Sequence, residues 1–159
     1  MLRTDKKIID VCCGSKMFWF DKNNQNVIFN DIRSEKHTLC DGRTLKIHPD
    51  TNMDFTDLCD IPSGSMKLVV FDPPHLKSLG QNSWMAKKYG VLDNNWKTLI
   101  SKGFSECFRV LERDGVLIFK WNETDIRTSE ILKLTDKNPL FGHLSGKRSN
   151  THWVCFINS

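Results

Sequence analysis

The sequence predicts a doubly wound α/β fold, in which a mostly parallel sheet ends in an antiparallel C-terminal hairpin. Several short runs are almost continuously apolar, which is typical of parallel strands that are covered on both faces. A strongly periodic amphipathic helix lies between the last two of these runs, and two β-rich segments around a polar turn close the chain. A chain of 159 residues is expected to form one domain, covering residues 1–159.

The expected elements follow one another along the chain. Apolar runs predict strands at 6–13, 26–32, 68–72 and 115–121. Apolar residues recur at intervals of three and four from Trp96 to Leu111, which predicts the main helix, with Asp93 or Asn94 as its cap and the Arg-Asp-Gly sequence at 113–115 as its end. A shorter helix is expected at 129–134. The segments 139–144 and 151–157 are expected to pair as the terminal hairpin.

Composition and cysteine spacing argue against several classes of protein. The apolar runs are far shorter than the roughly 20 residues that cross a bilayer, and the N-terminal segment lacks a signal-peptide core, so no membrane contact and a cytoplasmic location are expected. The six cysteines include no Cys-x-x-Cys motif, which favours reduced thiols over disulfides. His37 and Cys40 have ligand-like spacing, but no second pair completes a tetrahedral site, so no metal is expected.

Positive charge is concentrated in the second half of the chain. The formal net charge is +4, and lysines outnumber acids in the segments 77–102 and 133–148. A basic excess of this kind favours an acidic partner such as DNA or RNA. Charge alone is equally well explained by lysines on solvated helix faces.

The predicted strands end on residues that suit a nucleoside. Ligands of doubly wound sheets bind at the carboxyl ends of the strands. The first strand leads into Gly14, which allows the backbone to turn close to a ligand, and the second ends near Asp31, at a spacing where an acid accepts hydrogen bonds from ribose hydroxyls. Asp54 or Asp57 would face an adenine amino group. Singly, each acid is more simply a cap or turn former, and the ordered set is what favours a site.

The sequence Asp-Pro-Pro-His at 72–75 directly follows the third strand. Prolines fix the backbone and donate no hydrogen bond, so two of them end the strand in a rigid loop. The tetrad resembles motif IV of class I S-adenosylmethionine-dependent methyltransferases that modify amino groups. The wider chain, including CCGSKMFWFDKNN, AKKYG, GVLIFKWNE and THW, resembles small methyltransferase-like proteins of bacteriophages and prophages of Gram-positive bacteria. This resemblance implies a Rossmann-like domain with S-adenosyl-L-methionine as its cofactor.

The resemblance also implies roles for individual residues. In that family, the Asp carboxylate and the first proline carbonyl accept the two N–H groups of the acceptor amine, while the cofactor methyl group waits in line. The implied catalytic residues are Asp72, Pro73, Pro74 and His75. The implied cofactor-binding residues are Asp10, Cys12, Cys13, Gly14, Lys16, Asp31, Ile32, Asp54 and Phe55.

Two features depart from the family pattern. His75 stands where an aromatic residue usually stacks on the target base. Gly14 is the sole glycine of the first loop, and Lys16 stands where a second glycine would be expected and would meet the methionine carboxylate. The segment 15–26 is also short for the crossover helix that usually joins parallel strands.

The predicted function is methyl transfer from S-adenosylmethionine to an amino group of a nucleic-acid base in DNA or RNA. Two alternatives stay open: an acceptor on a protein side chain or small molecule, and a non-catalytic module that binds nucleic acid or a partner. Aromatic residues that stack on bases, together with lysines, form the candidate substrate site. Its members are Lys87, Lys88, Tyr89, Lys120, Trp121 and Trp153. Because the chain is too short for a separate recognition domain, a homodimer or a recognition subunit is a further expectation.

Overall fold

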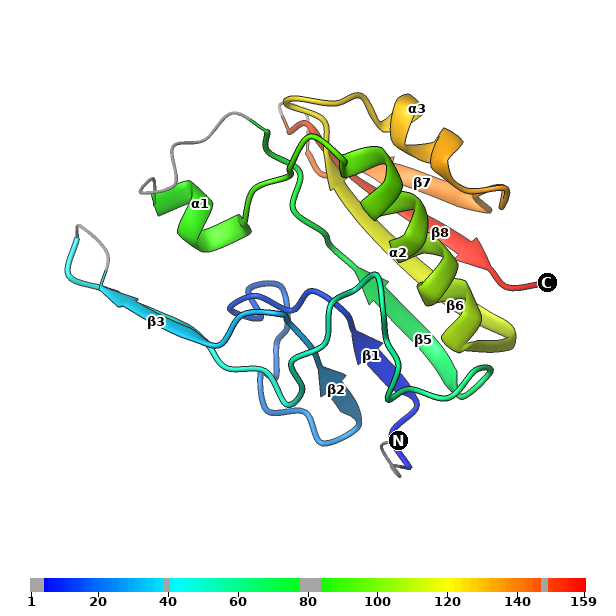
Figure 1. The fold of residues 1–159 in the computed structure, drawn as a ribbon, viewed down its shortest axis with the longest axis horizontal. Coiled ribbons are helices and arrows are strands. Elements are labelled where there is room, and N and C mark those ends of the chain that lie inside the picture. Colours follow the sequence, from blue (N-terminus) through cyan, green and yellow to red (C-terminus); the bar gives the residue numbers. More distant parts are fainter. Residues whose placement is uncertain (1–4, 39–40, 78–83, 147–148) are drawn as a thin grey trace.

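A six-stranded sheet forms the centre of the protein in a computed structural model, which describes residues 5–38, 41–77, 84–146 and 149–159 (Figure 1). The order of its strands is β2-β1-β5-β6-β8-β7. The first four strands in this order run parallel, and β8 and β7 are antiparallel to their neighbours. The strands are β1 (Ile8–Asp10), β2 (Val27–Phe29), β5 (Met66–Phe71), β6 (Leu111–Asn122), β7 (Phe141–Leu144) and β8 (Thr151–Ile157). This topology confirms the predicted fold class and its C-terminal hairpin.

The main helix, α2 (Trp96–Val110), is confirmed, but both of its predicted ends are wrong in detail. Asn95 occupies the N-cap position, and Asp93 lies in the preceding turn, where its Oδ1 accepts the Asn95 N–H at 2.7 Å. At the other end, β6 begins directly after Val110. The Arg-Asp-Gly sequence lies inside this long strand, where Asp114 has a φ of 62°.

Helix α2 lies over β5 and β6 (Figure 1) and covers one face of the sheet. The ring of Phe104 packs against Phe119 of β6 at 4.8 Å and against Phe71 of β5 at 5.6 Å, measured between ring centroids. Gly103 permits this close approach, because a Cβ atom there would lie 2.6 Å from the Phe71 ring. The short helix expected at 129–134 is confirmed as α3 (Thr128–Ile131) followed by the 3-10 helix η1 (Leu132–Leu134).

On the face of the sheet opposite to α2, a loop covers β1 and β2. The segment 14–26 contains turns and no helix, as its short length leads one to expect. The ring of Trp19 packs edge-on against Phe29 of β2, with 5.2 Å between centroids. This loop places its backbone beside the carboxyl end of β1, where the candidate site lies.

An antiparallel arm extends away from the six-stranded sheet (Figure 1). Its strands are β3 (Glu35–Thr38) and β4 (Thr44–Ile47), and their register places Lys36 directly opposite Lys46. The sequence expectations include neither this arm nor helix α1 (Trp84–Tyr89). Among the described helices, none is long and apolar enough to cross a bilayer.

Candidate functional site

A cleft opens at the carboxyl ends of β1, β2 and β5, where the strand order reverses between β1 and β5. Ligands of doubly wound sheets bind at this position. The cleft has a volume of about 800 Å³ when its open mouth is counted. Its walls come from 11–15 after β1, 31–33 after β2, 72–75 after β5, and Lys120 of β6, with Phe55 and the first loop completing them.

The cleft brings together many of the residues predicted from the sequence. The predicted cofactor residues that line it are Cys12, Cys13, Gly14, Asp31, Ile32 and Phe55, and the predicted catalytic residues Asp72, Pro73, Pro74 and His75 line it as well. Gly14 has a φ of 50°, a backbone conformation that favours glycine. Lys16 also has a positive φ, 57°. Its position therefore has the backbone that a second glycine would adopt most easily.

Asp10 lies behind the first loop and does not line the cleft. Its side chain is fully buried, and its two oxygens accept hydrogen bonds from the Cys12 N–H at 3.2 Å and from the Trp19 indole N–H at 2.7 Å. Burial, followed by repulsion from Asp72 and Asp31, outweighs these hydrogen bonds and raises the pKa of Asp10 to about 7. In this structure Asp10 holds the loop that forms the cleft wall.

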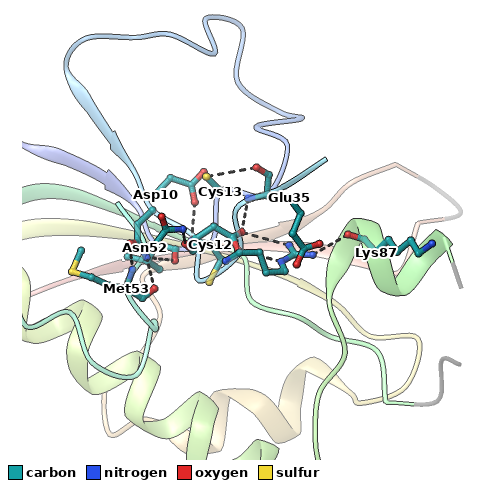
Figure 2. A network of polar contacts seen from close by, with 12 residues as sticks. Asp10, Cys12, Cys13, Glu35, Asn52, Met53 and Lys87 are labelled. Carbon is teal, nitrogen blue, oxygen red and sulfur yellow. Dashed lines mark hydrogen bonds and ion pairs between the residues drawn. The ribbon is translucent and has the colours of Figure 1, made fainter. Parts of the chain in front are cut away.

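Asp31 is the centre of a polar network at the rim of the cleft. Its Oδ2 accepts the Gly14 N–H at 2.8 Å, and its Oδ1 accepts the backbone N–H of Arg33 at 2.9 Å and the guanidinium of Arg33 at 3.2 Å. Arg33 also donates to the carbonyl oxygen of Lys87 in α1 at 2.9 Å. Figure 2 shows this network, with Asn52 and Met53 at one end, Cys12 in the middle and Lys87 at the other end.

Asp72 and Lys120 form an ion pair on the wall of the cleft. The Nζ atom of Lys120 lies 2.6 Å from Oδ2 of Asp72, and both side chains are largely buried. Burial raises the pKa of Asp72, and the charge of Lys120 opposes that rise. Burial, assisted by repulsion from Lys120, lowers the pKa of His75 to about 4, so its imidazole is neutral at pH 7.

Other predicted site residues lie outside the cleft. Lys16 donates to the carbonyl of Lys22 at 3.1 Å, and its Nζ lies 4.0 Å from the centroid of the Phe29 ring. Asp54 accepts hydrogen bonds from the backbone and hydroxyl of Thr56, both at 2.8 Å, as a turn former does.

The predicted substrate residues differ in how exposed they are, and one of them belongs to the core. Trp121 is fully buried and stacks on Phe119, so it belongs to the core. Trp153 is half-buried and meets the ring of Phe18 edge-on at 5.3 Å. The side chains of Lys88 and Tyr89 lie outside the described part of the chain. Of the two residues with metal-ligand spacing, His37 and Cys40, the second also lies outside it. His37 itself contacts Glu35, with 2.6 Å between Nε2 and Oε2.

Sequence reasoning missed several contributors to the site, and three of them show what they do there. Arg33 covers Asp31, Phe18 lines the cleft, and Asn30 is fully buried below it. The amide of Asn30 donates to the carbonyls of Val11 and Met53 at 3.1 Å and 2.9 Å, which ties the first loop to the segment after β4. The adjacent Asn-Asp pair at the end of an apolar run was the available signal.

Comparisons with known proteins support the fold and go no further. No protein-family model and no curated protein matches the chain. A solved SAM-dependent methyltransferase from Methanosarcina mazei is 13% identical, with a TM-score of 0.58 and coverage of 98% of this chain and 93% of that one. A protein from Pyrococcus horikoshii is 11% identical, with a TM-score of 0.56 and coverage of 94% and 80%.

A SAM-dependent methyltransferase from Leishmania major is also similar in structure, with 10% identity, a TM-score of 0.54 and coverage of 94% of this chain and 63% of that one. At this level of identity, the likeness concerns the arrangement of the chain. The protein therefore has the Rossmann-like fold of S-adenosylmethionine-dependent methyltransferases.

Proposed function

We propose that the protein is an S-adenosylmethionine-dependent methyltransferase that transfers a methyl group to an amino group of a nucleic-acid base. The observation that carries the proposal is the position of Asp72 and Pro73. Both lie at the carboxyl end of β5, in the wall of the cleft where this fold binds its ligand. This position at the end of β5 supports the proposal, because the motif resembles that of amino-methyltransferases.

The lining of the cleft fits the cofactor in chemical character. The carboxylate of Asp31 lies beside the backbone of Gly14, which suits the hydroxyl groups of a ribose. Ile32 and Phe55 offer apolar surface to an adenine ring. A bound ribose would either share the Asp31 carboxylate with the guanidinium of Arg33 or displace that guanidinium from it. When bound, S-adenosylmethionine supplies an electrophilic methyl group on a positively charged sulfur.

The residues of the chain orient the acceptor amine. An amino group on a base is a weak nucleophile because its lone pair is delocalised into the ring. Asp72 and the carbonyl of Pro73 would accept its two N–H bonds and direct the lone pair towards the cofactor, so most of the rate enhancement comes from positioning. The methylated nitrogen must then lose a proton. A carboxylate whose pKa is raised by burial is a better acceptor for that proton.

The arm formed by β3 and β4 supports a nucleic acid as the substrate. Lys36 and Lys46 are both exposed and directly opposite each other, and neither forms an ion pair with any described residue. Like charges in this arrangement destabilise a strand pair, which favours a surface that meets an anion. The sequence resemblance to small phage methyltransferase-like proteins supports the same proposal. A base within a duplex would have to be flipped out, whereas a single strand would bind directly.

Transfer of radiolabelled methyl groups tests this function. The purified protein is incubated with labelled S-adenosylmethionine and, separately, with unmethylated DNA, bulk RNA and lysate protein. The proposal predicts label in DNA or RNA that disappears when Asp72→Ala replaces the wild type. Label in protein alone would replace the proposed acceptor with a side-chain amide, and no label in any acceptor would contradict the enzyme itself.

A further inference from the structure

A second cavity shares a wall with the cofactor cleft. Besides that wall, it is lined by Leu76, Met85, Asn122, Thr124 and Thr151. Its volume is about 590 Å³, including its open mouth. None of these five residues lines the cleft, so the cavity is a separate space that begins where the candidate cofactor site ends.

Three side chains form the shared wall: Asp72, His75 and Lys120 each line both spaces. Asp72 therefore belongs to the wall of the cleft on one side and to the wall of the second cavity on the other. Methyl transfer requires this arrangement, because donor and acceptor must meet in line at one point.

We propose that the second cavity, named here the acceptor cavity, receives the ring that bears the acceptor amino group, and that Lys120 is the positioning residue that holds Asp72 at the boundary. This inference rests on the proposed function and adds to it the location of the acceptor. The cavity combines an apolar part, from Leu76 and Met85, with a polar part, from Asn122, Thr124 and Thr151. A planar heteroaromatic ring with a polar edge has the same two characters.

The polar part of the acceptor cavity is built in advance. The amide of Asn122 donates to the hydroxyl of Thr151 at 3.1 Å, and its Oδ1 accepts the hydroxyl of Thr124 at 2.6 Å. Asn122 is therefore held from two sides. A fixed amide costs little side-chain entropy when it binds the polar edge of a ring.

Lys120 is fixed by three groups. Its Nζ contacts Oδ2 of Asp72 at 2.6 Å, and lies 5.2 Å from the ring centroid of Phe18 and 5.6 Å from that of Trp153. Ammonium groups are attracted to aromatic faces at these distances. Among the described residues, Oδ2 of Asp72 has this one partner and Oδ1 has none, so Oδ1 is the oxygen that stays available for the acceptor N–H.

The charges around Asp72 define what removal of Lys120 would do. The charge of Lys120 favours the ionised form of Asp72, whereas a negative charge on the buried Asp10 opposes it. Cys12 adds no charge near pH 7, because burial raises the pKa of its thiol well above the usual value. His75 is neutral near pH 7 and adds no charge there. Without Lys120, the pKa of Asp72 would rise further.

The acceptor cavity is tested by filling it. Met85→Trp places a larger side chain in the cavity, and Ser129→Trp on the exposed surface of α3 is the matched control. We expect Met85→Trp to lower kcat/KM for the nucleic-acid substrate at least tenfold and to leave the affinity for S-adenosylhomocysteine within twofold of the wild type, and Ser129→Trp to change neither. An unchanged kcat/KM in Met85→Trp would overturn the assignment, as would an equal loss of S-adenosylhomocysteine binding.

A binding measurement separates this assignment from the proposed function. The methyl resonance of Met85 is followed by NMR while deoxyadenosine or deoxycytidine is added to the protein saturated with S-adenosylhomocysteine. A shift of this resonance in a protein that transfers no methyl group would support the cavity and contradict the enzyme. No shift together with no transfer would contradict both.

The role of Lys120 is tested by titration of Asp72. Carboxyl carbon NMR of the free protein should show a higher pKa for Asp72 in Lys120→Met than in the wild type, and a smaller change in Lys120→Arg, which keeps the charge. The acid limb of the pH–rate profile should move to higher pH in Lys120→Met by the same amount, because the transfer needs ionised Asp72. An unmoved Asp72 titration would overturn the role of Lys120.

Discussion

The buried carboxyl of Asp10 predicts that stability falls as the pH rises through the weakly acidic range. Its pKa is raised from 3.8 to about 7 in the folded protein, chiefly by burial. Between these values the folded state holds a proton that the unfolded state has released, so the unfolding free energy decreases with pH. At about 1.4 kcal/mol for each pKa unit, the total loss between pH 4 and pH 7 is on the order of 4 kcal/mol.

Urea unfolding at several pH values, followed by tryptophan fluorescence, measures this effect. Asp10→Asn is the matched variant, because its amide does not ionise. Asparagine satisfies only one of the two donors, Cys12 N–H and Trp19 N–H, so the variant carries a destabilisation that does not depend on pH. The informative quantity is therefore the slope.

We expect the wild type to lose about 4 kcal/mol relative to Asp10→Asn between pH 4 and pH 7, with little further change above pH 8. Parallel stability curves for the two proteins across this range would refute the reasoning. They would mean that Asp10 is ionised in the folded state at the same pH as in the unfolded chain.

Two further predictions concern the core and the arm. Gly103→Ala should lower the unfolding free energy by about 1 to 3 kcal/mol, because the new Cβ would lie 2.6 Å from Phe71 and 2.8 Å from Phe55. This cost exceeds the gain from the higher helix propensity of alanine, and since Phe55 lines the cleft, S-adenosylhomocysteine binding should weaken as well. Equal stability of the two proteins in urea unfolding would contradict this packing. Replacing both Lys36 and Lys46 by serine should weaken binding to single-stranded DNA and reduce the slope of log K against log salt by about 1.4, since each phosphate contact contributes about 0.7. Arg113→Ser, on an exposed part of β6 near the other end of the sheet, should leave the slope unchanged, and an unaltered slope in the double variant would remove the arm from the interface.

The central sheet and α2 could be predicted because nearly every residue of these segments fits the pattern of its element. Buried strands such as β5 (Met66–Phe71) are nearly all apolar, and the helix shows its buried face at intervals of three and four. The arm is missed because its strands are short and mostly polar, with Leu45 and Ile47 as the buried residues. Its Asp41-Gly42 turn was a usable signal.

The candidate site could be predicted as a set of segments, whereas the partners of each side chain could not. The order of acids and prolines after the strands identifies 12–14, Asp31 and 72–75, since parallel strands bring their carboxyl ends to one edge. No sequence pattern shows that the indole of Trp19 satisfies Asp10, or that Lys120 occupies Oδ2 of Asp72. Such pairs depend on sheet register and on loop conformation, which bring together residues far apart in the chain.

The most direct test of the central claim measures cofactor binding and methyl transfer in the same pair of proteins, wild type and Asp72→Ala. Calorimetry with S-adenosylhomocysteine is suitable, because this product lacks the positive sulfur that an unpaired Lys120 would repel. We predict that both proteins bind it with similar affinity and that Asp72→Ala transfers methyl groups to nucleic acid at least 10²-fold more slowly, the scale of a lost catalytic base. A wild type that does not bind S-adenosylhomocysteine, or an Asp72→Ala variant that transfers at the wild-type rate, would contradict the account.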